Sequence, residues 1–179
     1  RGLGDVYKRQ GLDIDYRVTA LPEVDESYPD TLSGEEIPLY ISQEKAAAYR
    51  RFMKDNTLLI TADTIVWLDG KVYGKPRDIA DAKAMLQALS GKTHTVITGV
   101  TLTSLQKQIS FAVSTEVTFA ALGDDEIDYY VETYRPLDKA GAYGVQEWIG
   151  YIGVTGLKGS YYNVMGLPIQ RLYTELKKF

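Results

Sequence analysis

Asp63 and Lys75 have the residue types and the spacing for acid–base or metal chemistry. Asp63 closely follows the apolar run Leu58-Leu59-Ile60, and Lys75 lies between Gly74 and Pro76. The apolar run predicts a buried strand. An acid where such a strand leaves the core is held rigidly and still reaches solvent, as a metal ligand or proton acceptor must. We therefore expect a functional carboxylate at Asp63, although a lone aspartate at a strand end is more often a cap or turn residue.

A predicted hairpin connects the two residues. The segment Leu68-Asp69-Gly70-Lys71 carries the Asp-Gly signal of a two-residue turn. This turn returns the chain so that Lys75 can lie near Asp63. The glycine before Lys75 permits a tight approach, and the proline after it restricts the lysine backbone. The pairing with Gly-Lys-Pro favours a functional Asp63 over a simple turn residue.

The remaining patterns predict the elements that must position these residues. Strands are predicted at residues 14–18, 58–67, 96–102 and 111–119, and helices from about Pro38 and at 78–89, 124–134 and 167–179. The turn around residues 106–108 predicts a long antiparallel hairpin between the last two strands. Residues 21–34 are expected to form a loop. The pattern indicates an α/β fold with a mixed sheet.

Composition limits the function classes. The chain has 179 residues, 45% hydrophobic and 25% charged, which predicts one globular domain. Its net charge of −4 gives no broad cationic surface for a nucleic-acid polymer. Without cysteine there is no disulfide, iron–sulfur cluster or thiol nucleophile, and a single histidine, His94, excludes a histidine-rich zinc site. No membrane span or signal peptide is visible, so we expect a cytoplasmic protein without a membrane partner.

Several motifs together resemble one family. Residues 60–76 are similar to the signature of the Maf proteins, nucleoside triphosphate pyrophosphatases related to the Ham1-type inosine triphosphatases. Further similar segments lie at residues 24–27, 44–46, 138–146 and 159–168. The resemblance covers residues 11–179 and implies a single Maf-like pyrophosphatase domain. It also implies a Maf/Ham1-like (inosine triphosphatase-like) α/β fold, with a mixed twisted sheet flanked by helices.

The resemblance implies a metal-dependent phosphate site. Asp63 matches the proposed proton acceptor, and Glu26 matches an acidic position tied to metal or water; we expect both to bind a divalent cation, Mg²⁺ or Mn²⁺. Lys45 and Lys75 match phosphate contacts. Without the resemblance, Glu26 in a proline-rich loop and Lys45 on an alanine-rich helix would be read as solvated residues.

Two positions resemble the branch that acts on dTTP and UTP. Thr64 follows the catalytic aspartate, and Gln146 ends the run Tyr143-Gly144-Val145-Gln146. Relatives that act on 7-methylguanosine triphosphate tend to carry Gln and Glu there. A glutamine amide offers donors and an acceptor, which can match O4 and N3–H of uracil or thymine. We therefore expect a dTTP/UTP pyrophosphatase, with Thr64 and Gln146 contacting the base.

The first ten residues depart from the family pattern. Residues 1–10 lack the Ser-x-Pro-Arg-Arg loop, which Lys8 and Arg9 are not placed to replace. We expect this segment to come from a truncated or wrongly joined reading frame and to lower activity; a divergent start is the alternative. A nucleotide-binding or regulatory module with little turnover, linked to cell division, therefore stays open. A Ham1-type enzyme is less favoured because its Thr-x-Asn-x-x-Lys pattern is absent, and a homodimer is left open.

Overall fold

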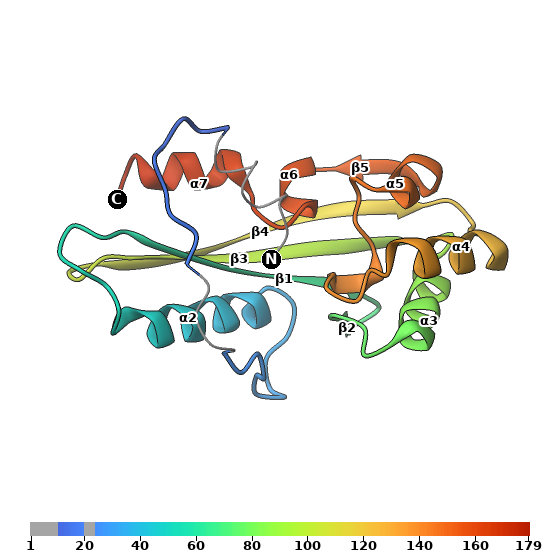
Figure 1. Cartoon of the computed structure of the whole chain (residues 1–179), viewed down its shortest axis with the longest axis horizontal. Coiled ribbons are helices and arrows are strands. Elements are labelled where there is room, and N and C mark those ends of the chain that lie inside the picture. Colours follow the sequence, from blue (N-terminus) through green and yellow to red (C-terminus); the bar gives the residue numbers. More distant parts are fainter. Residues whose placement is uncertain (1–10, 20–23) are drawn as a thin grey trace. The chain divides into compact units, whose positions relative to one another are not determined.

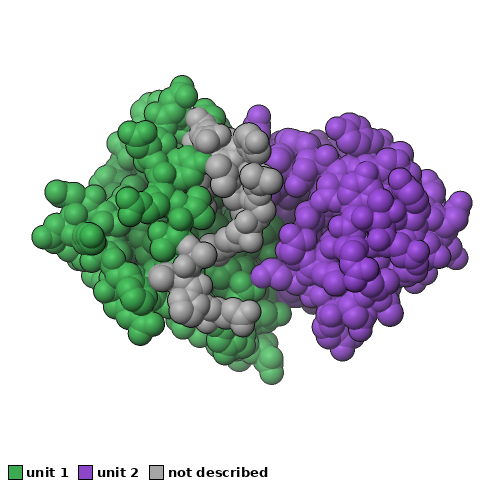
Figure 2. Space-filling view, viewed as in Figure 1, with its two compact units in different colours: residues 1–64, 97–113, 166–179 green, residues 65–96, 114–165 purple. Residues whose placement is uncertain are grey.

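The computed structural model describes residues 11–19 and 24–179. These residues belong to two units, each assembled from separate stretches of sequence (Figure 2). The first unit contains residues 1–64, 97–113 and 166–179, and the second contains residues 65–96 and 114–165. The anomalous segment predicted at residues 1–10 lies outside the described residues. The single domain expected over residues 11–179 stays a prediction.

Five strands form one sheet in the order β2-β1-β3-β4-β5 (Figure 1). They are β1 (Leu59–Leu68), β2 (Lys71–Tyr73), β3 (Thr93–Thr103), β4 (Gln108–Phe119) and β5 (Val154–Lys158). β1 pairs antiparallel with β2, and β4 pairs antiparallel with β5. Asp69 and Gly70 join β1 to β2 with φ angles of 51° and 75°, as the predicted two-residue turn requires.

Helices accompany this sheet, which confirms the predicted α/β fold class. They are α2 (Glu36–Arg50), α3 (Ile79–Leu89), α4 (Asp124–Tyr134), α5 (Trp148–Gly153), α6 (Tyr161–Val164) and α7 (Ile169–Leu176), with the 3-10 turn η1 (Ala140–Ala142). α3 begins as predicted because the Asp78 carboxylate accepts a hydrogen bond from the Asp81 amide at 2.8 Å. No helix of the described residues is long and apolar enough to cross a membrane.

The first unit packs a helix on each face of its strands. Figure 1 shows α2 and α7 on opposite sides of this part of the sheet. Strand alternation explains the division: Leu102 packs with Leu172 of α7, whereas Thr101 contacts α2. Gly99 permits the close approach of α2, since a Cβ there would lie 2.4 Å from the Pro38 carbonyl carbon.

Two sequence expectations about strands are wrong. Residues 14–18 form no strand, and Ile14 and Val18 are 45% and 50% exposed. Alternation produces a strand only where a neighbouring strand supplies backbone partners. Leu58 is also exposed, and the deeply buried apolar part of β1 begins only at Ile65. Burial depends on which strand residues the helices cover, and the local sequence does not reveal that.

The second unit has its own core, which contains the single histidine. His94 Nε2 lies 2.7 Å from the Tyr143 hydroxyl, and both rings meet Phe119 edge-on. Burial lowers the pKa of His94 to about 4, so the imidazole is neutral in the folded protein near pH 7. Tyr161 and Tyr162 are exposed because they lie on the short helix α6, outside the core cluster.

Candidate active site

Asp63 lies in the middle of β1 rather than at its end. It is the fifth residue of a ten-residue strand that continues to Leu68. The expectation of a strand-end carboxylate is therefore wrong, because β1 extends beyond the apolar run into the hairpin. The Asp63 side chain is nevertheless 11% exposed. A strand interior fixes its backbone, and the residual exposure keeps part of the side chain in contact with solvent.

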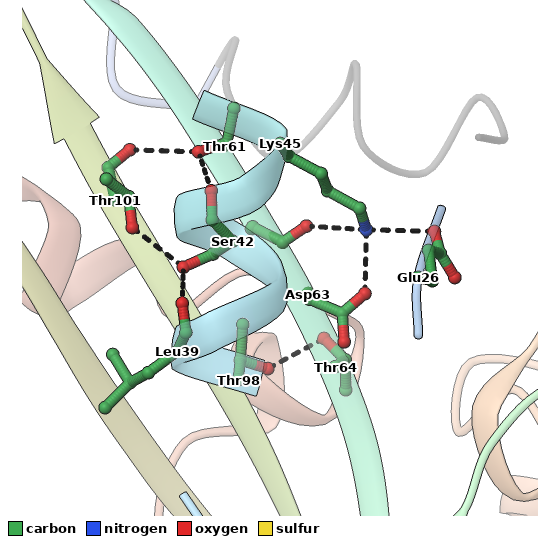
Figure 3. Close-up of polar contacts among 10 residues, drawn as sticks. Glu26, Leu39, Ser42, Lys45, Thr61, Asp63, Thr64, Thr98 and Thr101 are labelled. Atoms are coloured by element: carbon green, nitrogen blue, oxygen red, sulfur yellow. Dashed lines mark hydrogen bonds and ion pairs between the residues drawn. The ribbon is translucent and has the colours of Figure 1, made fainter. Parts of the chain in front are cut away.

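Lys45 is the centre of the site. Its Nζ lies 2.7 Å from Asp63 Oδ1 and 3.0 Å from Glu26 Oε1, and it donates to the Ala62 carbonyl at 3.4 Å (Figure 3). The Lys45 side chain is only 6% exposed. An ammonium group is buried only with partners that compensate its charge, and here two carboxylates do so.

The position of Lys45 corrects its sequence-based placement. The helix composition alone indicated a solvated lysine, but Lys45 belongs to the buried face of α2 with Ile37 and Ile41. These residues are spaced at i, i+4 and i+8, which places them on one helix face. The signal was therefore present in the sequence. A lysine in register with two buried isoleucines must meet a charge partner inside the fold.

Glu26 approaches from the loop before α2. Its side chain is 40% exposed, so it contributes the solvent-facing carboxylate of the pair. The neighbouring turn is closed by Ser27, whose amide and hydroxyl both donate to the Asp25 carboxylate at 2.9 Å. These two hydrogen bonds lower the pKa of Asp25, and the bond from the Ser27 backbone amide contributes most. The turn gives a local reason for the loop conformation that presents Glu26.

The paired carboxylates have the chemistry of a cation site. Glu26 and Asp63 converge on one cationic nitrogen, and carboxylate oxygens are hard donors of the kind that Mg²⁺ prefers. No group of three or more His, Cys, Asp or Glu side chains gathers for a metal within the described ranges. Mg²⁺ commonly binds through one or two carboxylates, with water and substrate phosphates completing its coordination. The donor set fits that mode.

Thr64 does not join this cluster. Successive strand residues point to opposite faces, so Asp63 and Thr64 diverge. The Thr64 hydroxyl lies 2.9 Å from the Thr98 hydroxyl (Figure 3). The structure therefore brings together Glu26, Lys45 and Asp63, and it places Thr64 on the other face of β1.

Lys75 and Gln146 are both exposed and belong to the second unit. Gly141 links their segments, since its amide donates to the Gly74 carbonyl at 3.1 Å. It also has a φ of 69°, and a Cβ there would lie 2.8 Å from Val66 Cγ2. The loop that carries Gln146 is thus fixed against the residue before Lys75. The predicted proximity of Lys75 to Asp63 stays a prediction.

The Gln146 loop is further held by Tyr130 of α4. Its hydroxyl accepts from the Gly144 amide at 3.0 Å and donates to the Glu147 carboxylate at 3.1 Å. Burial raises the pKa of Tyr130 well above its usual range, so the phenol stays a neutral donor. Lys139 adds an ion pair with Glu147 at 3.1 Å. Gln146 therefore projects from a loop whose two flanks are anchored.

Sequence reasoning missed three buried hydroxyl groups beside the cluster. Ser42, Thr61 and Thr101 are 0%, 3% and 0% exposed and connect α2 to the sheet (Figure 3). Their signal was weak, because serine and threonine also occur on exposed faces. The alternation of Thr101 with buried Val100 and Leu102 was the available indication.

Comparisons with known proteins agree with the resemblance seen in the sequence. A family model described as Maf-like protein matches residues 8–179. The chain is 67% identical over 168 residues to a dTTP/UTP pyrophosphatase of Phocaeicola vulgatus, which covers 94% of this chain and 87% of that protein. A dTTP/UTP pyrophosphatase of Bacteroides fragilis is 63% identical over the same shares. One of Porphyromonas gingivalis is 54% identical over 94% of this chain and 86% of its own length.

Proposed function

The chain belongs to the Maf family, and from this premise we propose that it is a dTTP/UTP pyrophosphatase, as its relatives are named. It cleaves the bond between the α- and β-phosphorus atoms and releases the nucleoside monophosphate and pyrophosphate. The observation that carries the proposal is the buried ammonium of Lys45 between the carboxylates of Glu26 and Asp63. These are the charges that such a hydrolysis needs: a cation for phosphate, and acids for metal and water.

Asp63 orients the attacking water and accepts its proton. A general base must lie within hydrogen-bond reach of that water and stay in place during the reaction. The strand backbone and the bond to Lys45 Nζ at 2.7 Å restrict the Asp63 carboxylate. Lys45 then serves two roles: it orients Asp63, and it contacts the substrate phosphates. Lys75 adds a second phosphate contact.

Glu26 and Asp63 hold a divalent cation, Mg²⁺ or Mn²⁺. Such an ion, when bound, spreads the negative charge that develops on the phosphates. Lys45 already shows how the site compensates a cation, because both carboxylates approach its nitrogen within 3.0 Å.

Gln146 reads the base. Its amide can accept from N3–H and donate to O4 of uracil or thymine. The anchored flanks of its loop support this role, because a side chain that selects a base must be held in place. Thr64 is the second proposed base contact. Its bond to Thr98 and its position on the face of β1 opposite Asp63 give this role less support than that of Gln146.

Product analysis tests the function. We expect the chain with Mg²⁺ to convert UTP and dTTP to monophosphate and pyrophosphate in equal amounts, with slower conversion of 7-methylguanosine triphosphate. Release of the diphosphate and inorganic phosphate would instead place cleavage between the β- and γ-phosphorus atoms. Binding of UTP without any turnover would contradict the proposed pyrophosphatase activity and support a nucleotide-binding module instead. A cytoplasmic location and a homodimer stay predictions.

A further inference from the structure

A chain of hydroxyl groups connects α2 to two strands of the first unit and returns to α2. Gln43 of α2 donates to Ser110 of β4 at 3.1 Å, and the Ser110 hydroxyl lies 2.9 Å from that of Thr101 on β3. The Thr101 hydroxyl lies 2.7 Å from that of Ser42, which donates to the Leu39 carbonyl at 2.8 Å. Both ends of the chain therefore lie on the same helix.

The direction of every bond in this chain is determined. A carbonyl oxygen only accepts, so the single Ser42 hydroxyl proton is used on Leu39. The Thr101 hydroxyl must then donate to Ser42, and the Ser110 hydroxyl must donate to Thr101. The Gln43 amide completes the series as the donor to Ser110. Hydrogen bonds arranged head to tail polarise one another, and each hydroxyl is satisfied only while its neighbours stay in place.

Thr61 ties the same helix to β1. Its hydroxyl donates to the Ser42 carbonyl at 2.7 Å, and both residues are buried. Ser42 lies three residues before Lys45 on α2, so the two share a helix face. Thr61 lies two residues before Asp63 on β1, so these two share a strand face. The Thr61–Ser42 bond and the Lys45–Asp63 ion pair are thus successive connections between the same two elements (Figure 3).

We propose that Ser42, Thr61 and Thr101 are positioning residues for the reaction. They fix the height and rotation of α2 at which the Lys45 ammonium reaches Asp63. The inference rests on the proposed function for its catalytic consequence, but the placement of Lys45 can be measured without turnover. In this role they act through Lys45.

The test compares variants that keep or remove a single hydroxyl. Thr101→Val removes the hydroxyl with little change in shape, and Thr101→Ser retains it. Thr103→Val is the matched control, because Thr103 lies on the same face of β3, is 0% exposed and accepts a hydrogen bond from Gln108 of β4. Thr61→Val and Thr61→Ser form a second pair if the first valine variant does not fold.

Two measurements separate positioning from general damage. The first is the ¹⁵N-ammonium NMR signal of Lys45 without substrate, assigned by its absence in Lys45→Met. The second is kcat and KM for UTP. Thr101→Val should lose or shift the Lys45 signal and lower kcat by about 10- to 100-fold, since displacements of about 1 Å can cost that much. Thr101→Ser should restore both, and Thr103→Val should change neither.

The outcomes separate the positioning role of the hydroxyl groups from the proposed pyrophosphatase function. An unchanged Lys45 signal and an unchanged kcat in folded Thr101→Val would overturn the positioning role. Equal losses in Thr101→Val and Thr103→Val would also overturn it, because they would indicate general loss of buried polar bonds. Absence of turnover in the unmodified chain would refute the proposed function alone, since the NMR comparison would still decide whether the hydroxyl chain places Lys45.

Discussion

Lys45 and Lys83 each lie between two carboxylates, one in the first unit and one in the second. Lys83 Nζ is 2.8 Å from both Asp128 and Glu132, and Lys45 Nζ is 3.0 Å from Glu26 and 2.7 Å from Asp63. The pairwise distances are nearly the same. The surroundings differ, because the Lys83 side chain is 25% exposed and its partners are 55% and 65% exposed, whereas Lys45 is 6% exposed.

The origin of the partners differs as well. Asp128 and Glu132 are four residues apart on α4, so they are neighbours wherever that helix forms. Hydrogen bonds to these two carboxylates raise the pKa of Lys83, and the bond to Asp128 contributes most. Glu26 and Asp63 come from a loop and a strand and meet only in the folded first unit. Exposed pairs of the Lys83 kind add little stability, whereas buried charges carry a desolvation cost that suggests selection for function.

Removal of the Lys45 charge should lower activity more than changes at Gln146 or Lys83. Lys45→Met should lower kcat/KM for UTP by about 10- to 150-fold, the value of one charge-assisted hydrogen bond. The same variant should bind Mn²⁺ more tightly without nucleotide, because Glu26 and Asp63 lose their internal cation. Calorimetric titration with Mn²⁺ checks this. Weaker Mn²⁺ binding in a folded Lys45→Met protein would contradict the shared cation site.

Gln146→Glu should show that the second unit also contributes to function. The carboxylate cannot donate to O4, and the two facing acceptors stay unpaired once bound nucleotide covers them, so kcat/KM for UTP should fall by about 5- to 150-fold. The ratio of kcat/KM for UTP to that for 7-methylguanosine triphosphate decides, since a uniform loss would indicate only damage. Thr64→Gln, added to Gln146→Glu, should favour the methylated nucleotide further. An unchanged ratio would remove Gln146 from base recognition.

The second unit should show a pH dependence of stability through His94. The unfolded imidazole titrates near 6.5, whereas the folded one titrates at about 4 because of burial. As pH falls between these values the unfolded chain takes up the proton first. The free energy of unfolding should therefore decrease by about 3 kcal/mol across that window.

Denaturant titrations between pH 4 and 7 measure this decrease. A folded His94→Gln variant is the control, since it keeps a polar side chain without a titration in this range. Its free energy of unfolding should fall less than that of the unmodified chain over the same window, the remainder coming from carboxylates. Parallel slopes for the two proteins would exclude His94 as the titrating group.

Lys83→Met should have the smallest effect. Its carboxylate partners remain in water, so the loss leaves no buried charge. We expect kcat and KM for UTP to equal those of the unmodified chain and the Tm to change by about 2 °C or less. Mn²⁺ binding should not increase. An increase equal to that of Lys45→Met would mean that any lysine-paired carboxylates suffice to bind the ion.

Much of the fold was predictable because local signals agreed. Asp78 capped α3, and the Asp69-Gly70 turn marked the first hairpin. The short elements α5, α6 and η1 were missed because a few residues show no period. The strand predicted at residues 14–18 failed because pairing depends on a neighbouring strand, which alternation does not supply.

The candidate site was also only partly predictable from the sequence. Lys45 shared its helix register with Ile37 and Ile41, so its burial could have been inferred from the sequence. The approach of Glu26 could not, because it comes from a loop whose path depends on tertiary contacts. The resemblance supplied that residue, and the structure supplies its distance to Lys45. Thr64 shows the reverse case, since adjacency to Asp63 in sequence places it on the opposite face.

The most direct test of the central claim is kcat for UTP in Asp63→Asn, compared with Asp128→Asn. Both changes replace one lysine-paired carboxylate with a nearly isosteric amide. Asp63→Asn should keep the fold, as judged by circular dichroism, and lower kcat by about 100- to 10,000-fold through loss of the general base. Asp128→Asn should retain the full rate. A folded Asp63→Asn protein with kcat within a few-fold of the unmodified chain would contradict the Glu26–Lys45–Asp63 cluster as the catalytic centre.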